Sequence, residues 1–307
     1  MARALQPSVV TMPRVDAPYP TILAFLVGRF PAIAPEIWLR RIVEGTVRDE
    51  QDRQITLESG YLPQQRLFYF REVEVEPVIP FSEQIIYRDD EILVACKPHF
   101  LPVTPGGKYV GECLLNRLRE RTGIADLVPL HRIDRETAGL VLFSVNRKTR
   151  GAYGTLFMAG HIEKCYEAVA LCHQVPERNR WEIENRIGRG EPWFLMKTEA
   201  GVSNARSTIL LREIRNDRGV FHLFPHTGKT HQLRLHMGEL GFGILNDRYY
   251  PLLQPEQEDD FTAPLQLLAK SVHFTDPLTG HQRDFVSGRS LCMDFLSEKT
   301  SPATPAT

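Results

Sequence analysis

The chain has 307 residues, 42% hydrophobic and 24% charged, so it can bury a substantial core and still form a second, smaller domain. The formal net charge of −1 gives no overall attraction to nucleic acid, and no run of 18 apolar residues is present. These features argue against a strongly basic nucleic-acid-binding protein and against a membrane-spanning helix.

Residues 1–20 contain four prolines, no helical or strand periodicity, and no basic region followed by an apolar one. We therefore expect an extended N-terminal arm rather than a secretory signal, and a cytoplasmic protein. The next apolar spacings predict two short helices, at 21–30 and 35–44. Runs at 46–48, 54–57 and 67–70 predict the strands of a small sheet. The sequence thus predicts a small α/β module over residues 21–76.

After a linker at 77–82, the pattern predicts a larger α+β domain over residues 81–297. It opens with a hairpin, and its predicted strands are 85–87, 92–96, 140–145, 163–171 and 221–224. Its predicted helices are 112–121, 147–158 and 230–240, the last with Thr230 as N-cap. We interpret the acidic run Glu256, Glu258, Asp259 and Asp260 as a solvated loop, and residues 298–307 as a disordered tail.

The segment 131–139 (HRIDRETAG) places Asp134 between Arg132 and Arg135, with His131 nearby, just before an apolar run. Because opposite charges within a few ångströms favour the ionised form, we expect Asp134 to be a carboxylate at neutral pH. It could then act as a base or a nucleophile. The alternative is an ordinary surface ion pair or helix cap.

The sequence HRIDRETAGLVLF resembles the HRLDxxTSGLLL signature of pseudouridine synthases of the RluA/RsuA type. Four further segments resemble landmarks of this family, namely Lys97-Pro98 with Pro102 (KPxG), 164–166 (KxY), 226–236 (TGRTHQIRxH) and 246–250 (GDxxYG). The resemblance covers residues 81–297. The chain departs from the family pattern at Lys229, Ala138 and Asn246, and none of these changes removes an expected catalytic side chain.

The resemblance implies the family's catalytic fold, with a mixed, mostly antiparallel central sheet. It also likens residues 21–76 to the small RNA-binding module, first known from a ribosomal protein, that often precedes this domain. The module's usual VNGK turn is replaced by RDEQDR at 48–53, so a packing appendage is the alternative. The implied function is an isomerase that converts uridine to pseudouridine in structured rRNA or tRNA. A catalytically inactive RNA-binding relative and a glycosidase-type hydrolase are the rival hypotheses.

By resemblance, Asp134 is the catalytic carboxylate. Whether it adds to the ribose, adds to the pyrimidine or removes the 2′-proton stays open. If 163–171 is a strand, Lys164 and Tyr166 point to the same face. The Tyr166 ring could stack on the displaced uracil, and its hydroxyl could relay the proton of carbon 5. The alternative is that Tyr166 only fills the core or surface.

Arg234 is the basic residue that the resemblance pairs with Asp134; a solvated helix arginine is the alternative. Arg132 resembles the motif arginine that helps to displace the target nucleotide. The predicted substrate-binding residues are Arg132, Lys164, His226, Thr227, Lys229, His231 and Gln232.

We expect no cofactor and no metal, with RNA as the partner. His226, His231 and His236 are spaced by five, whereas zinc ligands on one helix face are spaced by three or four. The five cysteines are odd in number, scattered and without a C-x-x-C pair, which favours reduced thiols. The absence of heptads argues against a coiled-coil dimer, and we expect a monomer.

Overall fold

The computed structural model describes residues 2–4 and 6–292, which fall into two compact units. One contains residues up to 78 together with 105–116, and the other contains 79–104 together with the residues from 117 on. The predicted tail at 298–307, and the last residues of the predicted catalytic domain, lie outside the described residues.

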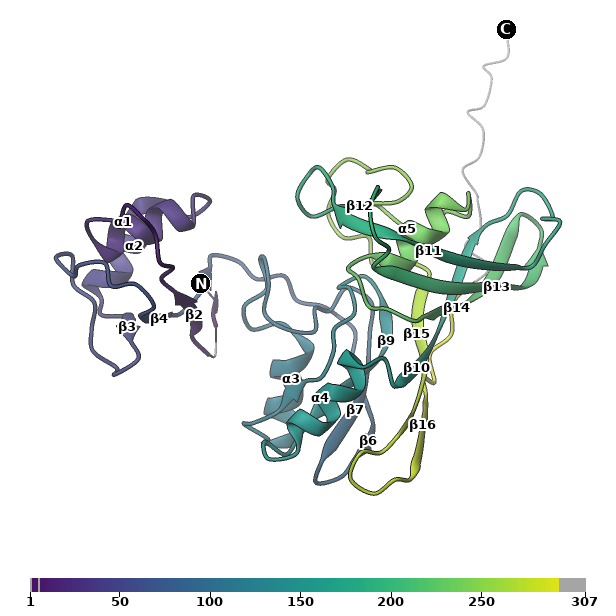
Figure 1. Cartoon of the computed structure of the whole chain (residues 1–307), viewed down its shortest axis with the longest axis horizontal. Coiled ribbons are helices and arrows are strands. Elements are labelled where there is room, and N and C mark those ends of the chain that lie inside the picture. Colours follow the sequence, from purple (N-terminus) through teal and green to yellow (C-terminus); the bar gives the residue numbers. More distant parts are fainter. Residues whose placement is uncertain (1, 5, 293–307) are drawn as a thin grey trace, which may run out of the picture. The chain divides into compact units, whose positions relative to one another are not determined.

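The smaller unit combines two helices with a three-stranded antiparallel sheet (Figure 1). The helices are α1 (Ile22–Arg29) and α2 (Pro35–Val43), and the sheet has the order β2 (Ser8–Thr11), β4 (Arg66–Tyr69), β3 (Val47–Asp49). A separate pair joins β1 (Ala2–Arg3) to β5 (Glu72–Val73). The Thr21 hydroxyl accepts a hydrogen bond from the Ala24 N–H at 3.1 Å and so starts α1 at the predicted place. Apolar side chains from both helices and the sheet form one core.

Two segments of this unit differ from the sequence predictions. The N-terminal arm is not free of the core, because β2 pairs with β4 and Met12 is fully buried. Residues 54–57 form no strand, and only Gln54 makes an isolated bridge, to Arg48. The pairing of β2 with β4 joins segments remote in sequence, which local periodicity does not reveal. Residues 54–57 make only a short contact with β3, through the Gln54 bridge and a hydrogen bond from the Ile55 N–H to the Val47 carbonyl at 3.0 Å.

Residues 105–116 belong to the smaller unit although local patterns assign them to the catalytic domain. The carboxylate of Glu76 accepts hydrogen bonds from the backbone N–H groups of Val110, Gly111 and Glu112, at 2.6–3.1 Å. A charged acceptor that collects several N–H groups fixes a loop strongly.

The larger unit is built on a mixed sheet (Figure 1). Its strands are β6 (Gln84–Arg88), β7 (Ile92–Lys97), β8 (Val128–Pro129), β9 (Ala138–Ser144), β10 (Ile162–Leu171), β11 (Arg180–Arg189), β12 (Met196–Glu199), β13 (Ala205–Arg215), β14 (Arg218–Pro225), β15 (Leu267–Thr275) and β16 (Gln282–Val286). The order is β12-β11-β13-β14-β10-β15-β9-β7-β6, with β16 on β15 and β8 on β9. Among the described residues, every pairing is antiparallel except that of β9 with β15.

The helices of this unit are α3 (Leu114–Thr122, in this unit from Arg117 on), α4 (Arg150–Met158) and α5 (Gln232–Glu239). Tyr153 of α4 packs with apolar residues of β7, β9 and β15. Leu233 and Met237 of α5 pack with residues of β10, β11, β13 and β14. The α+β prediction with a mixed, mostly antiparallel sheet is confirmed.

Gly139, at the end of the HRIDRETAG segment, allows the parallel pairing of β9 with β15. It pairs with Ala269, and its φ is +116°. A Cβ atom here would lie 2.2 Å from the carbonyl oxygen of Ala269. Only glycine therefore lets β9 approach β15 so closely just after Asp134.

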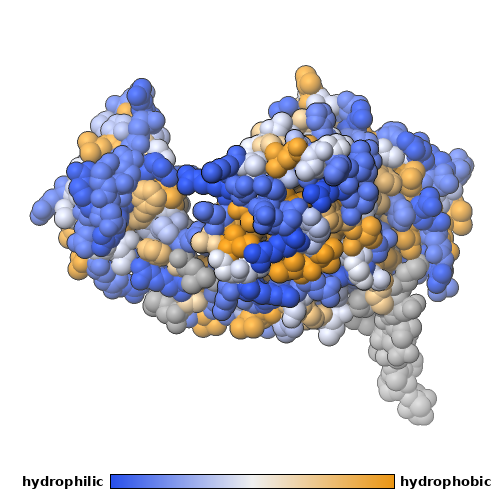
Figure 2. All heavy atoms as spheres, turned by 90° about the horizontal axis from the view of Figure 1, so that it is seen from below, coloured by the Kyte–Doolittle hydropathy of each residue, from blue (hydrophilic) through white to orange (hydrophobic). Residues whose placement is uncertain are grey.

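No helix in the described part of the chain is long and apolar enough to cross a membrane. On the face that Figure 2 shows, hydrophobic residues form separate patches between hydrophilic ones.

Candidate active site

A cleft of about 700 Å³ in the larger unit contains every residue that the sequence predicted for the site. Its lining includes Arg132, Asp134, Lys164, Tyr166, His226, Thr227, Lys229, His231, Gln232 and Arg234. Apolar side chains, among them Ile133, Phe157 and Ile162, complete the wall. This mixture of an apolar wall with a few convergent polar groups is typical of small-molecule and nucleotide sites.

The backbone around Asp134 is held by the Lys97-Pro98-His99 segment. Lys97 is fully buried, and its Nζ donates hydrogen bonds to the carbonyl oxygens of Arg135 (2.9 Å) and Pro98 (3.0 Å). The Nδ1 atom of His99 lies 2.7 Å from the carbonyl oxygen of Glu136. Burial lowers the pKa of Lys97 to about 7, against an ordinary value of 10.5. The KPxG-like segment thus fixes the loop that carries Asp134.

Asp134 is paired with Arg234, and not with the arginines beside it in the sequence. Its side chain is 25% exposed, and its Oδ2 lies 3.4 Å from Nη1 of Arg234. Its Oδ1 lies 3.9 Å from Nε2 of His231. The expectation that Arg135 pairs with this carboxylate is wrong, because Arg135 pairs with Glu136 and Asp259 instead. Side-chain direction in an irregular loop does not follow sequence order.

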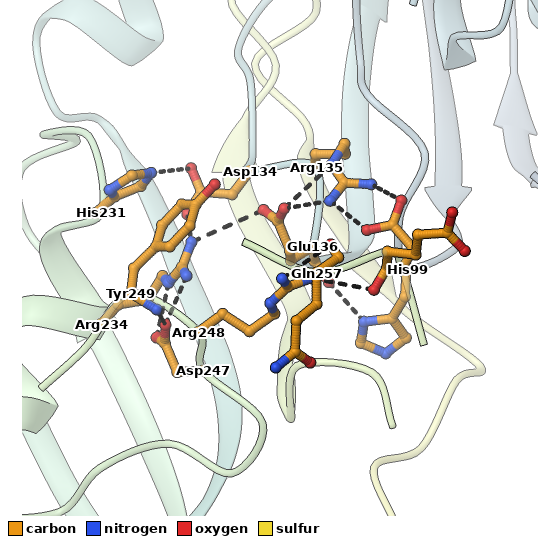
Figure 3. A network of polar contacts seen from close by, with 12 residues as sticks. His99, Asp134, Arg135, Glu136, His231, Arg234, Asp247, Arg248, Tyr249 and Gln257 are labelled. Carbon is orange, nitrogen blue, oxygen red and sulfur yellow. Dashed lines mark hydrogen bonds and ion pairs between the residues drawn. The ribbon is translucent and has the colours of Figure 1, made fainter. Parts of the chain in front are cut away.

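Arg135 points away from Asp134, towards two other carboxylates (Figure 3). It forms a two-pronged pair with Asp259, at 2.7 and 2.8 Å, and lies 2.8 Å from Glu136. The Asp259 side chain is only 11% exposed. The acidic run 256–260 is therefore not a wholly solvated loop, and the interpretation from charge alone is wrong for this residue.

His131 is a neutral part of the wall and not a cation near Asp134. Its ring stacks on Phe157, with centroids 4.6 Å apart, and its Nε2 accepts the backbone N–H of Leu142 at 3.1 Å. Burial lowers the pKa of His131 to about 3. His131 therefore contributes to the shape of the cleft wall and not to its charge.

Arg234 is the centre of the polar network that Figure 3 shows. The side chain is 2% exposed, and its Nε and Nη2 donate to both oxygens of Asp247 at 2.8 and 2.7 Å. Its guanidinium carbon lies 4.8 Å from the centroid of the Tyr249 ring. Burial acts to lower the pKa of Arg234, but Asp247, Asp134 and Glu136 outweigh it and raise the pKa. Arg234 is therefore a permanent, rigidly held cation.

Helix α5 begins two residues later than predicted. Its N-cap is His231 and not the predicted Thr230; His231 lies in the left-handed region with φ +53°, and its side chain makes no capping hydrogen bond. The helix start is stabilised instead by Gln232, whose Oε1 accepts from the Thr227 hydroxyl (2.7 Å) and the Lys229 N–H (3.0 Å). Its Nε2 donates to Ser207 and to the Arg206 carbonyl. Thr227 and Gln232 therefore use their polar groups to hold the cleft wall together.

Lys164 and Tyr166 both face the cleft from β10, as strand alternation predicted. Burial, aided by the charge of Asp134, raises the pKa of Tyr166, and burial lowers the pKa of Lys164. The Tyr166 hydroxyl thus stays protonated at neutral pH.

The three histidines with spacing of five have three different partners. His226 lies 2.9 Å from the Thr208 hydroxyl, His231 3.1 Å from the Tyr250 hydroxyl, and His236 3.1 Å from Oδ1 of Asn185. Within residues 2–4 and 6–292, no group of three or more His, Cys, Asp or Glu side chains is placed to hold a metal ion.

Sequence reasoning missed the residues that support the site. Asp247, Tyr249 and Tyr250 lie in the segment that resembles GDxxYG, and Lys97 lies in the one that resembles KPxG. A motif resemblance marks such residues, but it does not say that Asp247 clamps Arg234 or that Lys97 holds the Asp134 loop. Supporting contacts of this kind orient a reacting group.

A family model described as RNA pseudouridylate synthase matches residues 91–239. The chain is 29% identical over 222 residues to the dual-specificity RNA pseudouridine synthase RluA of Haemophilus influenzae, covering 69% of this chain and 96% of that protein. An uncharacterized RNA pseudouridine synthase of Synechocystis is 27% identical over 235 residues, with 75% and 79% covered.

The fold is also that of a solved human protein, RNA pseudouridylate synthase domain containing 1. The TM-score is 0.57 at 22% identity, covering 70% of this chain and 86% of that one. The chain belongs to the RNA pseudouridine synthase family, of the RluA type.

Proposed function

We propose that this chain isomerises uridine to pseudouridine in structured ribosomal or transfer RNA, with Asp134 as its catalytic carboxylate. The observation that carries the proposal is the pair of Asp134 and the buried Arg234, at 3.4 Å, on the wall of a cleft that also contains Tyr166. Arg234 compensates and aims the carboxylate, while the cleft admits the extruded nucleotide.

The reaction breaks the bond from ribose to N1, turns the uracil and forms a bond to carbon 5. Carbon 5 loses a proton and N1 gains one, so reactant and product have the same composition. Asp134 is the group that acts at the nucleoside, by addition to the ribose, by addition to the ring or by removal of the 2′-proton.

Tyr166 fits two roles: its ring is a stacking surface for the detached uracil, and its hydroxyl is a proton relay. Its ring can stack on uracil. Because burial raises the pKa of Tyr166, its hydroxyl does not act as a free phenolate base at neutral pH. It can receive the proton of carbon 5 only while it passes its own proton on, and Asp134 is the nearby acceptor whose charge it feels.

Substrate contacts fall to the more exposed residues of the cleft. Arg132 and Lys229 are exposed, and we assign them to the RNA backbone, with Arg132 also displacing the target nucleotide. Lys164, His226 and His231 supply further donors on the wall. Thr227 and Gln232 shape this wall through the hydrogen bonds described above.

The finer assignments belong to the same proposal. The smaller unit is a candidate RNA-binding module, and the enzyme is a cytoplasmic monomer that works without cofactor or metal. Analytical sedimentation of the purified protein measures its mass in solution and so tests whether it is a monomer. The electrostatic part of RNA binding should weaken with salt.

The decisive test uses RNA labelled with tritium at carbon 5 of uracil. Wild type should release tritium, and Asp134→Ala should release none while it still binds RNA. Asp126→Ala removes an exposed carboxylate of the same unit and should behave as wild type. RNA binding without tritium release by wild type would favour an inactive relative, and free uracil in solution would favour a hydrolase.

A further inference from the structure

The hairpin of β11 and β12 ends in an unusually exposed aromatic side chain. Trp193, in the turn between the two strands, is 77% exposed, whereas the other two tryptophans, Trp38 and Trp181, are buried. Tryptophan removes much apolar surface from water when it is covered, so an exposed one commonly marks a contact site.

The turn is held by backbone hydrogen bonds and by packing, so Trp193 is exposed although its backbone is well ordered. The Gly190 N–H donates to the Leu195 carbonyl at 2.8 Å, and the Leu195 N–H donates to the Pro192 carbonyl at 2.9 Å. Leu195 and Met196 pack on a buried cluster that includes Tyr250. The ring of Trp193 is therefore presented to solvent by an ordered scaffold.

A continuous row of rings connects Trp193 to the active site. The centroids of Trp193 and Phe194 lie 6.0 Å apart, and those of Phe194 and Tyr249 lie 5.4 Å apart. Tyr249 in turn lies over Arg234, the partner of Asp134 (Figure 3).

A second connection runs through Tyr250. Its hydroxyl accepts the Met196 N–H at 2.7 Å and lies 3.1 Å from Nδ1 of His231, which lines the cleft. The turn is thus fixed directly to the wall of the cleft.

The charges of the hairpin suit a nucleic acid. Arg189 and Lys197, near the ends of the two strands, are exposed, and the turn itself carries one carboxylate, Glu191. Arg186 is paired with Glu199 at 2.8 Å. An exposed ring and exposed cations on the same hairpin are the groups that bind unpaired bases and their phosphates.

We propose that Trp193 is a stacking platform for an unpaired base that flanks the target uridine, so that this hairpin contributes to the choice of RNA. The inference rests on the proposed function, because it takes RNA as the substrate. It adds a binding site outside the cleft, at the far end of the row of rings.

The test compares Trp193→Ala and Trp193→Phe with Val202→Ala, which truncates a side chain that is 85% exposed in the loop after β12. Against a stem-loop RNA that wild type modifies, Trp193→Ala should raise Kd and KM about tenfold, or ~1.4 kcal/mol, with the loss in KM and not in kcat. Trp193→Phe should recover most of the affinity, and Val202→Ala should match wild type.

Two further measurements separate stacking from other roles. RNA should quench the fluorescence of wild type, and this quenching should be lost in Trp193→Phe. The dependence of log Kd on log salt should keep its slope in Trp193→Ala, because stacking involves no phosphate, and should become shallower in Lys197→Gln.

Unchanged Kd, KM and quenching in the Trp193 variants would overturn the proposal. A change of oligomeric state in Trp193→Ala with RNA affinity intact would also overturn it, since Trp193 would then contact a second copy of the chain. If wild type bound RNA but released no tritium, the proposed function would fail, and the quenching would still report on the platform.

Discussion

The two sides of the Asp134 cleft carry the same kinds of charged residue in opposite environments. On the inner side, Arg234 is 2% exposed and clamped by Asp247. On the outer side, Arg132 and Lys229 are exposed. Burial fixes the inner arginine in one position, whereas the outer cations keep the freedom to reach a substrate. The inner side therefore prepares the carboxylate, and the outer side meets the RNA.

Removing Asp247 should have the largest effect on stability, because it removes the carboxylate that holds Arg234 on the inner side. Asp247→Ala leaves Arg234 as a poorly compensated buried charge, so we expect a loss of about 3–5 kcal/mol in the free energy of unfolding. Urea denaturation measures it. Asp284→Ala, which removes the exposed partner of His273, should cost less than about 1 kcal/mol. Equal losses would mean that burial does not distinguish the Arg234–Asp247 contact from the His273–Asp284 contact.

Tyr166 lines the same cleft, and its hydroxyl should affect only the rate of the reaction. Tyr166→Phe keeps the ring and removes the hydroxyl, so the rate of tritium release under single-turnover conditions should fall about 10²–10⁴-fold, the range of acid–base catalysis. RNA affinity should stay at the wild-type value, because stacking is retained. A wild-type rate in this variant would show that the Tyr166 hydroxyl takes no part in the proton transfer.

Arg132 tests the outer side. Because extrusion of a base costs a few kcal/mol, Arg132→Ala should lower kcat/KM about 10–100-fold. Its melting temperature should not change, since the side chain is exposed. Arg147→Ala, another exposed arginine of the same unit, is the control and should change neither quantity. A melting temperature well below that of the control would mean that Arg132 stabilises the fold and does not act mainly on the RNA.

The smallest predicted effect is the loss of folding stability at acid pH that the buried histidines cause. Burial lowers the pKa of His99 and His236 to about 4 and that of His131 to about 3, below the ordinary 6.5. Between these values the unfolded chain binds more protons than the folded one, so stability should fall as the pH drops from about 6.5 to about 4.

Urea denaturation at several pH values measures this slope. His236→Asn should make the slope shallower by one proton whatever its effect at pH 7.5. An unchanged slope would mean that His236 does not change its charge on unfolding.

Much of the site could be predicted from the sequence where the pattern is local or belongs to a family motif. Strand alternation placed Lys164 and Tyr166 on one face because side chains alternate strictly along an extended backbone. Motif resemblance selected ten residues that lie along one cleft, although their roles stay predictions. The errors fall where no period applies: the loop of Arg135, the acidic run at Asp259, and the start of α5.

The sequence by itself predicted the α+β class, all five helices but only seven of the sixteen strands of the described residues, and the family landmarks, because each of these depends on neighbours within a few residues. Only the tertiary structure decided that Asp134 pairs with Arg234 and that Asp259 holds Arg135. It also decided that Met12 is buried and that residues 105–116 belong with the smaller unit. These contacts join segments far apart in the chain, and their partners are selected by burial, charge and hydrogen-bond geometry once the sheet has formed.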